Sequence, residues 1–217
     1  MKKLKISVIL MAFFISCLFF GGCYNSKFLE EKVVYFKSDI LSGEQNDISV
    51  TCNNYWKKVN DEKVYCLSFY LNGLVSANVS YYISFNLNGK DYTEKFAFDP
   101  LYSNLHVNFT NANLKQKELN VEINYGNEKV LINLKSVIDK NVISIKQALN
   151  SLQQNQQGLI KHYTDKNGNF TANIILKISV INQKCYYFLE FNGDNVKNVA
   201  FLLNALNGEV LAIRNAT

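Results

Sequence analysis

Few side chains in this chain could carry acid–base chemistry. His106 and His162 are the only two histidines, and histidine is the side chain that ordinarily titrates near neutral pH. His106 alternates with the apolar residues Leu105 and Val107, so we expect its ring to face away from the apolar side of a strand. His162 stands in a polar, loop-like stretch. Neither position has the surroundings of a catalytic base.

Carboxylates offer a second route to chemistry. Asp91, Glu94 and Asp99 could serve an enzyme that acts on cell-envelope polymers, but nothing in the sequence pairs two of them across a cleft, as glycoside cleavage requires. Nucleophile elbows, glycine-rich phosphate loops and zinc-protease helices are absent from the sequence. We therefore predict no catalytic residues and treat the enzyme as the alternative hypothesis.

Metal and cofactor sites are not indicated either. The stretch from Asp165 to Asn169 offers oxygen ligands, but its glycine is misplaced for a calcium loop and no glutamate follows at the twelfth position, so a turn is predicted. Cysteine and histidine never occur at zinc spacing. The sequence predicts no metal site and no cofactor.

Three cysteines follow Cys23, namely Cys52, Cys66 and Cys185. Cys52 and Cys66 fall on what the pattern predicts to be successive strands, so they could form a disulfide in an oxidising compartment. The alternative is that all three are buried free thiols, since cysteine packs well as a small apolar side chain.

Tyrosines are the most suggestive binding residues. Tyr82, together with either Tyr186 or Tyr187, should project from the side of a strand opposite its apolar face. Exposed aromatic rings can bind sugars or proteins. The alternative is cross-strand pairing that only stabilises the sheet.

The elements that must position these residues are mainly strands. In the run 78–87, Val79, Tyr81, Ile83, Phe85 and Leu87 alternate with polar residues, which is typical of a half-buried strand. The turn residues 88–91 and a returning strand at 92–98 complete a hairpin. Further strands are predicted at 33–37, 48–52, 64–71, 105–109, 119–125 and 130–134. About eight short strands predict an immunoglobulin-like β-sandwich for residues 32–140.

The pattern changes near Asn141. Ile145, Ala148, Leu149 and Leu152 have helical spacing, Ser144 can cap the helix, and the glutamine-rich tail ends at Gly158. Strand-like runs follow at 170–181, 184–191, 196–204 and 209–214, and Asn207-Gly208 predicts a tight turn between the last two. One helix and an antiparallel meander predict a small α+β domain over residues 141–217.

This second domain resembles a PepSY-type domain, a small module of bacterial envelope proteins. The resemblance covers residues of about 142–214 and rests on three segments: the helix around Ala148-Leu149, the aromatic strand 186–191, and the closing segment 203–211. Asn204 stands where the family usually has aspartate. The resemblance implies one helix packed on a sheet, and a role in restraining a partner such as a peptidase.

The N-terminus has the layout of an export signal. Lys2, Lys3 and Lys5 precede the apolar stretch 6–20, and Gly21-Gly22 precede Cys23. The string Phe20-Gly21-Gly22-Cys23 resembles a lipobox, with phenylalanine where leucine is usual, which implies lipidation of Cys23. The alternatives are lipidation of Cys17, an uncleaved membrane anchor and plain secretion. We favour Cys23 because the residues after it are polar.

Charge limits the choice of partners. The net charge is +5, but with the three signal lysines removed the chain carries 20 basic against 18 acidic residues, and no basic cluster with interleaved aromatics is visible. This balance argues against nucleic-acid binding.

We therefore expect a signal peptide at 1–22, a lipidated tether at 23–31 and two β-rich domains on the extracytoplasmic side of the cell membrane. The predicted function is non-enzymatic binding or regulation of an envelope protein or wall component. A purely structural surface protein is a further alternative.

Overall fold

The computed structural model describes residues 27–73, 78–100, 104–193 and 196–215, so the predicted lipidation site, Cys23, lies outside the described residues. The described chain is mainly β, as predicted. Its strands are β1 (Val33–Gln45), β2 (Ile48–Val59), β3 (Glu62–Gly73), β4 (Tyr81–Leu87), β5 (Lys90–Lys95), β6 (Ala97–Asp99), β7 (Asn104–Thr110), β8 (Glu118–Tyr125), β9 (Glu128–Ser136), β10 (Asn173–Ile181), β11 (Lys184–Gly193), β12 (Val196–Asn204) and β13 (Val210–Asn215). Its helices are α2 (Lys27–Glu30), α3 (Ile145–Asn155) and α4 (Gln157–His162).

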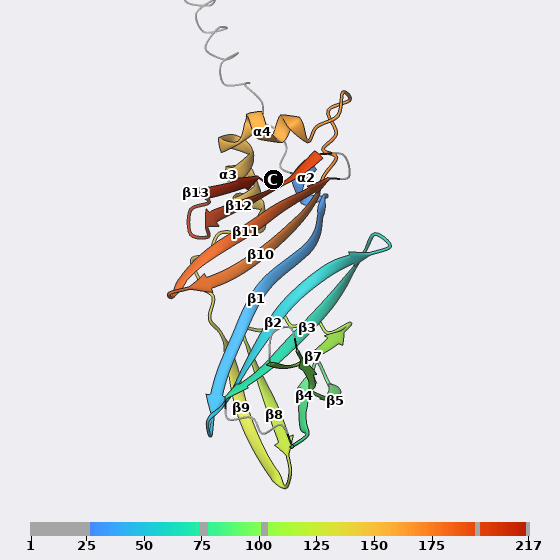
Figure 1. The fold of residues 1–217 in the computed structure, drawn as a ribbon, viewed down its shortest axis with the longest axis vertical. Helices are drawn as coiled ribbons and strands as arrows, with labels where there is room; N and C mark the ends of the chain where they lie inside the picture. Colours follow the sequence, from blue (N-terminus) through green and yellow to red (C-terminus); the bar gives the residue numbers. More distant parts are fainter. Residues whose placement is uncertain (1–26, 74–77, 101–103, 194–195, 216–217) are drawn as a thin grey trace, which may run out of the picture.

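The strands form one branched sheet (Figure 1). One path runs β13-β12-β11-β10-β1-β2-β3-β7-β6, and a branch leaves β1 through β9 and β8 to β4 and β5. The two ends of the N-terminal part, β5 and β6, are separated only by Phe96, whose main-chain N–H donates to the Tyr81 carbonyl at 2.9 Å. This part of the sheet is therefore nearly closed. Among the described strands, β1 and β10 form the one parallel pair.

The nearly closed part encloses a core that we call the N-terminal core. On β4, the side chains of Tyr81, Ile83, Phe85 and Leu87 are buried in it while Tyr82 is exposed, which confirms the alternation predicted for this run. The turn at Asn88-Gly89, with φ of 55° and 78°, returns the chain into β5 and confirms the predicted hairpin.

A second core, which we call the helix core, lies between α3 and strands β10 to β12. Ala148, Leu149 and Leu152 of α3 are fully buried against side chains such as Leu189 and Phe201. Ser144 caps α3: its hydroxyl accepts from the Gln147 main-chain N–H, and the Gln147 side chain accepts from the Ser144 N–H. The predicted helix and its cap are confirmed.

Strands β1 and β2 connect the two cores. β1 places Val33 in the helix core and Leu41 in the N-terminal core, and Leu29 of α2 also joins the helix core. On β2, Cys52 packs in the N-terminal core and Trp56 against the helix core. Both strands are much longer than predicted because one strand contributes to two cores in succession.

Candidate functional site

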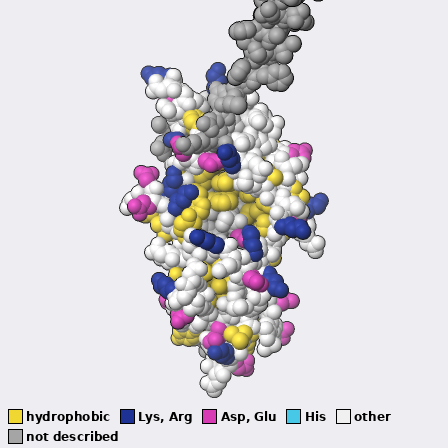
Figure 2. All heavy atoms as spheres, turned by 180° about the vertical axis from the view of Figure 1, so that it is seen from behind, with side chains coloured by type: hydrophobic (Ala, Val, Ile, Leu, Met, Phe, Trp, Pro, Cys, Tyr) yellow, Lys and Arg dark blue, Asp and Glu magenta, His cyan; other side chains and the backbone are white. Residues whose placement is uncertain are grey.

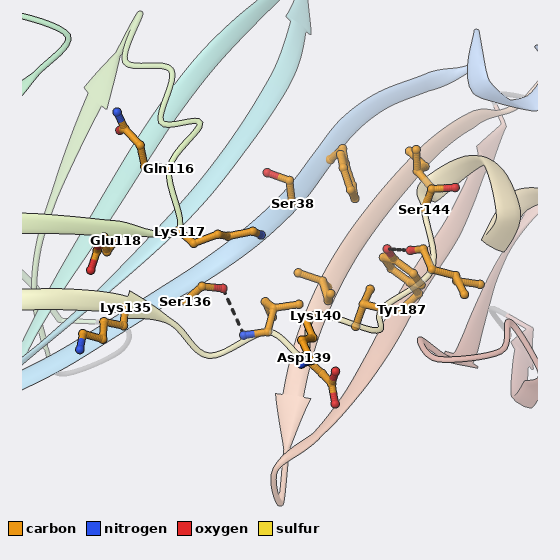
Figure 3. A pocket seen from close by; sticks show the side chains of 16 residues that line it. Ser38, Gln116, Lys117, Glu118, Lys135, Ser136, Asp139, Lys140, Ser144 and Tyr187 are labelled. Carbon is orange, nitrogen blue, oxygen red and sulfur yellow. Dashed lines mark hydrogen bonds between the residues drawn. The ribbon is translucent and has the colours of Figure 1, made fainter.

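A groove opens where β1 exchanges one neighbour for another. Residues Val33 to Lys37 of β1 pair with β10, whereas Leu41 and Ser42 pair with β9. Between these segments the register of β1 against β2 shifts, between Lys37 and Asp39. Because β9 and β10 pair with different segments of β1, a hollow of about 890 Å³ remains between the two parts of the molecule (Figure 3).

One wall of the groove is apolar and the other is polar. The apolar wall comes from the helix core and from the connection before α3, and consists of Phe36, Ile138, Val142, Ile143, Ile145, Ile178 and Tyr187. The polar residues are Ser38, Gln116, Lys117, Glu118, Lys135, Ser136, Asp139, Lys140 and Ser144. Three lysines and two carboxylates among them leave the groove with little net charge.

Asp39 holds the polar wall of the groove in place through its hydrogen bonds. This residue is only 3% exposed, and one carboxylate oxygen accepts from the Ile40 N–H at 2.9 Å and from the Ser136 hydroxyl at 2.5 Å. The other oxygen lies 2.7 Å from the ammonium group of Lys117, whose side chain extends toward β1 in Figure 3. A buried carboxylate with three donors is a well-satisfied one. It therefore ties β1, β9 and the segment before β8 together at the groove.

Tyr187 fixes the apolar wall. Its ring is 3% exposed and packs in the helix core, and its hydroxyl donates to the Ile143 carbonyl at 2.7 Å (Figure 3). Burial raises the pKa of the Tyr187 hydroxyl to about 12, so the hydroxyl stays protonated and continues to donate at neutral pH. Tyr187 thus holds the connection before α3 against the sheet.

The tyrosines predicted as binding residues do not come together. Tyr186 is half-buried on the opposite face of β11 from Tyr187, and Tyr82 is 41% exposed on β4. Four strands lie between β4 and β11 in the sheet, namely β8, β9, β1 and β10. Of the three tyrosines, only Tyr187 lines the groove.

Of the two alternatives for the cysteines, the structure has the buried free thiols and not the Cys52–Cys66 disulfide. Cys52 and Cys66 are both buried free thiols, as is Cys185. Cys52 lies opposite Phe69 on β3 and faces the N-terminal core, whereas Cys66 lies opposite Tyr55. Because Phe69 and Cys66 are three residues apart on one strand, the two sulfurs point to opposite faces of the sheet. Burial, followed by the nearby Asp39 charge, raises the pKa of the Cys52 thiol.

The candidate acid–base residues are dispersed. Nδ1 of His106 lies 3.9 Å from a carboxylate oxygen of Asp99, and the His106 ring stacks on Tyr70, so this histidine is half-buried rather than fully solvated. Asp91 accepts from the Asn86 side chain at 2.7 Å, and Glu94 faces the other side of β5 because it lies three positions, an odd number, further along the strand. The register thus keeps Asp91 and Glu94 from converging on one ligand.

Asp165 forms a turn. One of its carboxylate oxygens accepts from the main-chain N–H groups of Asn167 and Asn169, at 2.8 Å each. These hydrogen bonds lower the pKa of Asp165, and the one from the Asn169 N–H has the largest effect. This confirms the predicted turn. Within the described ranges, no group of three or more histidine, cysteine, aspartate or glutamate side chains could hold a metal ion.

Sequence reasoning missed a basic and aromatic surface on the uncovered face of the sheet. The strand register places Lys57 of β2 beside Tyr35 of β1, and Tyr55 of β2 beside Lys37 of β1, which in turn lies beside Lys177 of β10. We call these five residues the tyrosine–lysine face. They stand on the side of the strands opposite the two cores, as the alternation with Phe36, Trp56 and Leu176 requires. No local sequence signal could have revealed the tyrosine–lysine face, because it depends on the pairing of β1 with β10, which are distant in sequence.

No family model, curated protein or solved structure matches this chain. Among the helices that the structure describes, none is both long and apolar enough to cross a lipid bilayer.

Proposed function

We propose that this chain is a lipid-anchored extracytoplasmic protein that binds an envelope protein through the groove between its two cores and has no catalytic activity of its own. The groove is the observation that carries this proposal. It combines an apolar wall with charged residues of both signs along its border, which suits an extended protein segment better than a strongly charged ligand.

The fixed walls of the groove support the same proposal. Asp39 and Tyr187 hold the two walls through hydrogen bonds, so the binding surface exists before a partner arrives. Preorganisation lowers the entropic cost of binding. Figure 2 shows a face on which apolar side chains gather across the middle of the molecule with lysines beside them, a combination expected of a protein-binding surface.

The family assignment is part of the proposal. A helix packed on an antiparallel meander and the turn at Gly208 support a PepSY-like module in the C-terminal part. The family resemblance implies that such a module restrains its partner. For the N-terminal part, an immunoglobulin-like sandwich remains a proposal, supported by the nearly closed, mainly antiparallel sheet around one core.

The anchor is tested by fractionation and mass spectrometry of the full chain. We expect the N-terminal peptide of membrane-purified protein to begin at Cys23 and to carry acyl chains, and we expect Cys23→Ser to release the protein from the membrane. Wild-type protein with an unmodified Cys23 in the membrane fraction would refute lipid anchoring.

The groove is tested by site-specific photocrosslinking of the anchored protein in its own envelope. A photoreactive side chain at Ile145 or Lys140, which line the groove, should give a discrete adduct of one defined mass. The controls are Leu131 and Ile181, which are 61% and 54% exposed and lie outside the groove. Equal adducts at groove and control positions, or none at the groove, would contradict the proposal.

A further inference from the structure

The positive charge of the tyrosine–lysine face is not balanced by neighbouring acidic side chains. Lys37 and Lys177 are direct partners across the parallel pair of β1 and β10, so their ammonium groups lie on the same face of adjacent strands. In the part of the chain that the structure describes, none of Lys37, Lys57 and Lys177 forms an ion pair. Two acidic residues share this face nearby: Glu190 of β11, which lies opposite Ile175, and Glu62 of β3, which lies opposite Val59.

A charged Lys37 without an anionic partner lowers the stability of the fold. Its side chain is half-buried, and burial together with the charge of Lys177 lowers the pKa of its ammonium group. Two like charges side by side, one of them partly desolvated, weaken the fold unless an anion compensates them. The local fold therefore favours a bound anionic group between the two lysines.

The tyrosines provide a flat, neutral surface beside these charges. The rings of Tyr35 and Tyr55 stack with centroids 5.2 Å apart, and the ammonium group of Lys177 lies 5.8 Å from the Tyr35 centroid. Burial raises the pKa of the Tyr35 hydroxyl to about 12, so it remains a hydrogen-bond donor at neutral pH. Tyrosine hydroxyls beside a row of lysines can hydrogen-bond the oxygen atoms of a sugar or polyol unit.

The spread of the lysines sets the size of the ligand. Lys57, Lys37 and Lys177 lie on three successive strands, which spans roughly 10 Å at the usual strand spacing. One small anion cannot contact all three ammonium groups at once. A chain with an acidic group on successive units can do so.

We propose that the tyrosine–lysine face binds an acidic carbohydrate-type polymer, with its carboxylate or phosphate groups on Lys37, Lys57 and Lys177 and its uncharged units on Tyr35 and Tyr55. Nucleic acid is disfavoured by the small excess of basic residues outside the signal. A membrane surface is disfavoured because the two rings are half-buried and stacked on each other, and so cannot insert into a bilayer. This inference goes beyond the groove, which lies on the other face of β1.

The test is binding of the full-length chain, purified in a neutral detergent, to defined probes. Polygalacturonate supplies carboxylates, poly(glycerol phosphate) supplies phosphates and dextran supplies neither. We expect binding to one or both acidic polymers, weakening as salt is raised, and none to dextran. Equal binding to dextran would overturn the proposal. So would stronger binding to single-stranded DNA or to phosphatidylglycerol vesicles.

Variants then locate the site. Lys37→Gln combined with Lys177→Gln should weaken binding of the acidic polymer at least tenfold. The matched control combines Lys90→Gln with Lys129→Gln, which removes the same charge elsewhere and includes a separate lysine over a tyrosine ring, Lys90 over Tyr92 at 4.8 Å. The control should change affinity less than twofold. Equal losses in the two double variants would refute the site.

A second measurement on unaltered protein keeps the test decisive if the variants fold poorly. An anion bound beside Lys37 should raise its pKa, so saturating polymer should slow acylation of Lys37 at pH 9 at least fivefold while leaving Lys90 unaffected. Unchanged acylation of Lys37 would overturn the site. The groove is tested separately, by crosslinking at Ile145. Failure of polymer binding at the tyrosine–lysine face can therefore be distinguished from failure of protein binding at the groove.

Discussion

Removal of the Asp39 carboxylate should reveal how much the junction between the two cores contributes to stability. Asp39→Ala leaves the Ile40 N–H and the Ser136 hydroxyl without their acceptor and ends the contact with Lys117. Each of these two part-buried hydrogen bonds is worth about 1.5 kcal/mol, because its acceptor is charged. The ion pair adds only about 0.5 kcal/mol, because the Lys117 side chain is 71% exposed.

Part of this loss is regained because a carboxylate no longer has to be kept out of water. The net expectation is that Asp39→Ala lowers the free energy of unfolding by about 2–3 kcal/mol. Asp39→Asn retains the oxygen that both donors share but makes this acceptor uncharged, and it also loses the charged contact with Lys117, so we expect a loss of about 1 kcal/mol.

Urea unfolding of the chain without residues 1–23, followed by the fluorescence of Trp56, measures both losses. Trp56 is the only tryptophan and lies at the junction, 6.3 Å from the ring of Phe36. Glu122→Ala is the control, since it breaks an exposed ion pair with Lys129 and should cost no more than about 1 kcal/mol. If Asp39→Ala costs no more than Glu122→Ala, or no more than Asp39→Asn, the role given to the buried hydrogen bonds is wrong.

Three further predictions follow from local structure. Gly208→Ala should lower the free energy of unfolding by about 1–3 kcal/mol, because φ is 75° and the new Cβ would lie 2.7 Å from the Cβ of Ser151 on α3; a thermal melt within about 1 °C of wild type would argue against this. The pKa of Tyr187 rises from 10.0 unfolded to about 12 folded, so its contribution of about 2–3 kcal/mol is complete below pH 10 and is lost as pH rises from 10 to 12. Tyr187→Phe should therefore flatten the alkaline fall in stability measured by urea titration, whereas a change at the exposed Tyr82 should not. Alkylation at pH 8 without reductant should modify none of the three buried thiols in the folded protein and all three in urea; a thiol that stays unmodified in urea would indicate a disulfide.

Local elements were predictable from sequence because their signals are local. The hairpin of β4 and β5 follows from alternation around Asn88-Gly89, and α3 follows from its apolar spacing and the Ser144 cap. The length of β2 was not predictable, because its polar residue Asn54 lies in the strand and is buried. The Asn54 side-chain amide donates to the Leu114 carbonyl at 2.7 Å, 60 residues away. This hydrogen bond lets a residue type that is common in turns lie buried inside a strand.

The candidate sites depended on partners that sequence periodicity does not identify. Alternation indicates which side chains share a face, but it does not say which strand lies next to which. Lys37 and Lys177 meet only because β1 and β10 pair in parallel across 140 positions of chain, and the groove exists only because β1 changes neighbours at Ser38-Asp39. The choice between a Cys52–Cys66 disulfide and free thiols stayed open for a related reason, since adjacent strands can still direct two thiols to opposite faces.

The parallel pairing of β1 with β10 also determines when the start of β1 can complete its folding. The start of β1 is synthesised early, yet its partner at residues 173–177 is synthesised about 140 residues later. Until then, Val33 to Lys37 have main-chain groups along one edge that only β10 can pair, and pairing over so long a separation is slow. The newly made chain therefore completes its fold only when its C-terminal strands are present, and a chain that ends near residue 140 should expose this edge and aggregate.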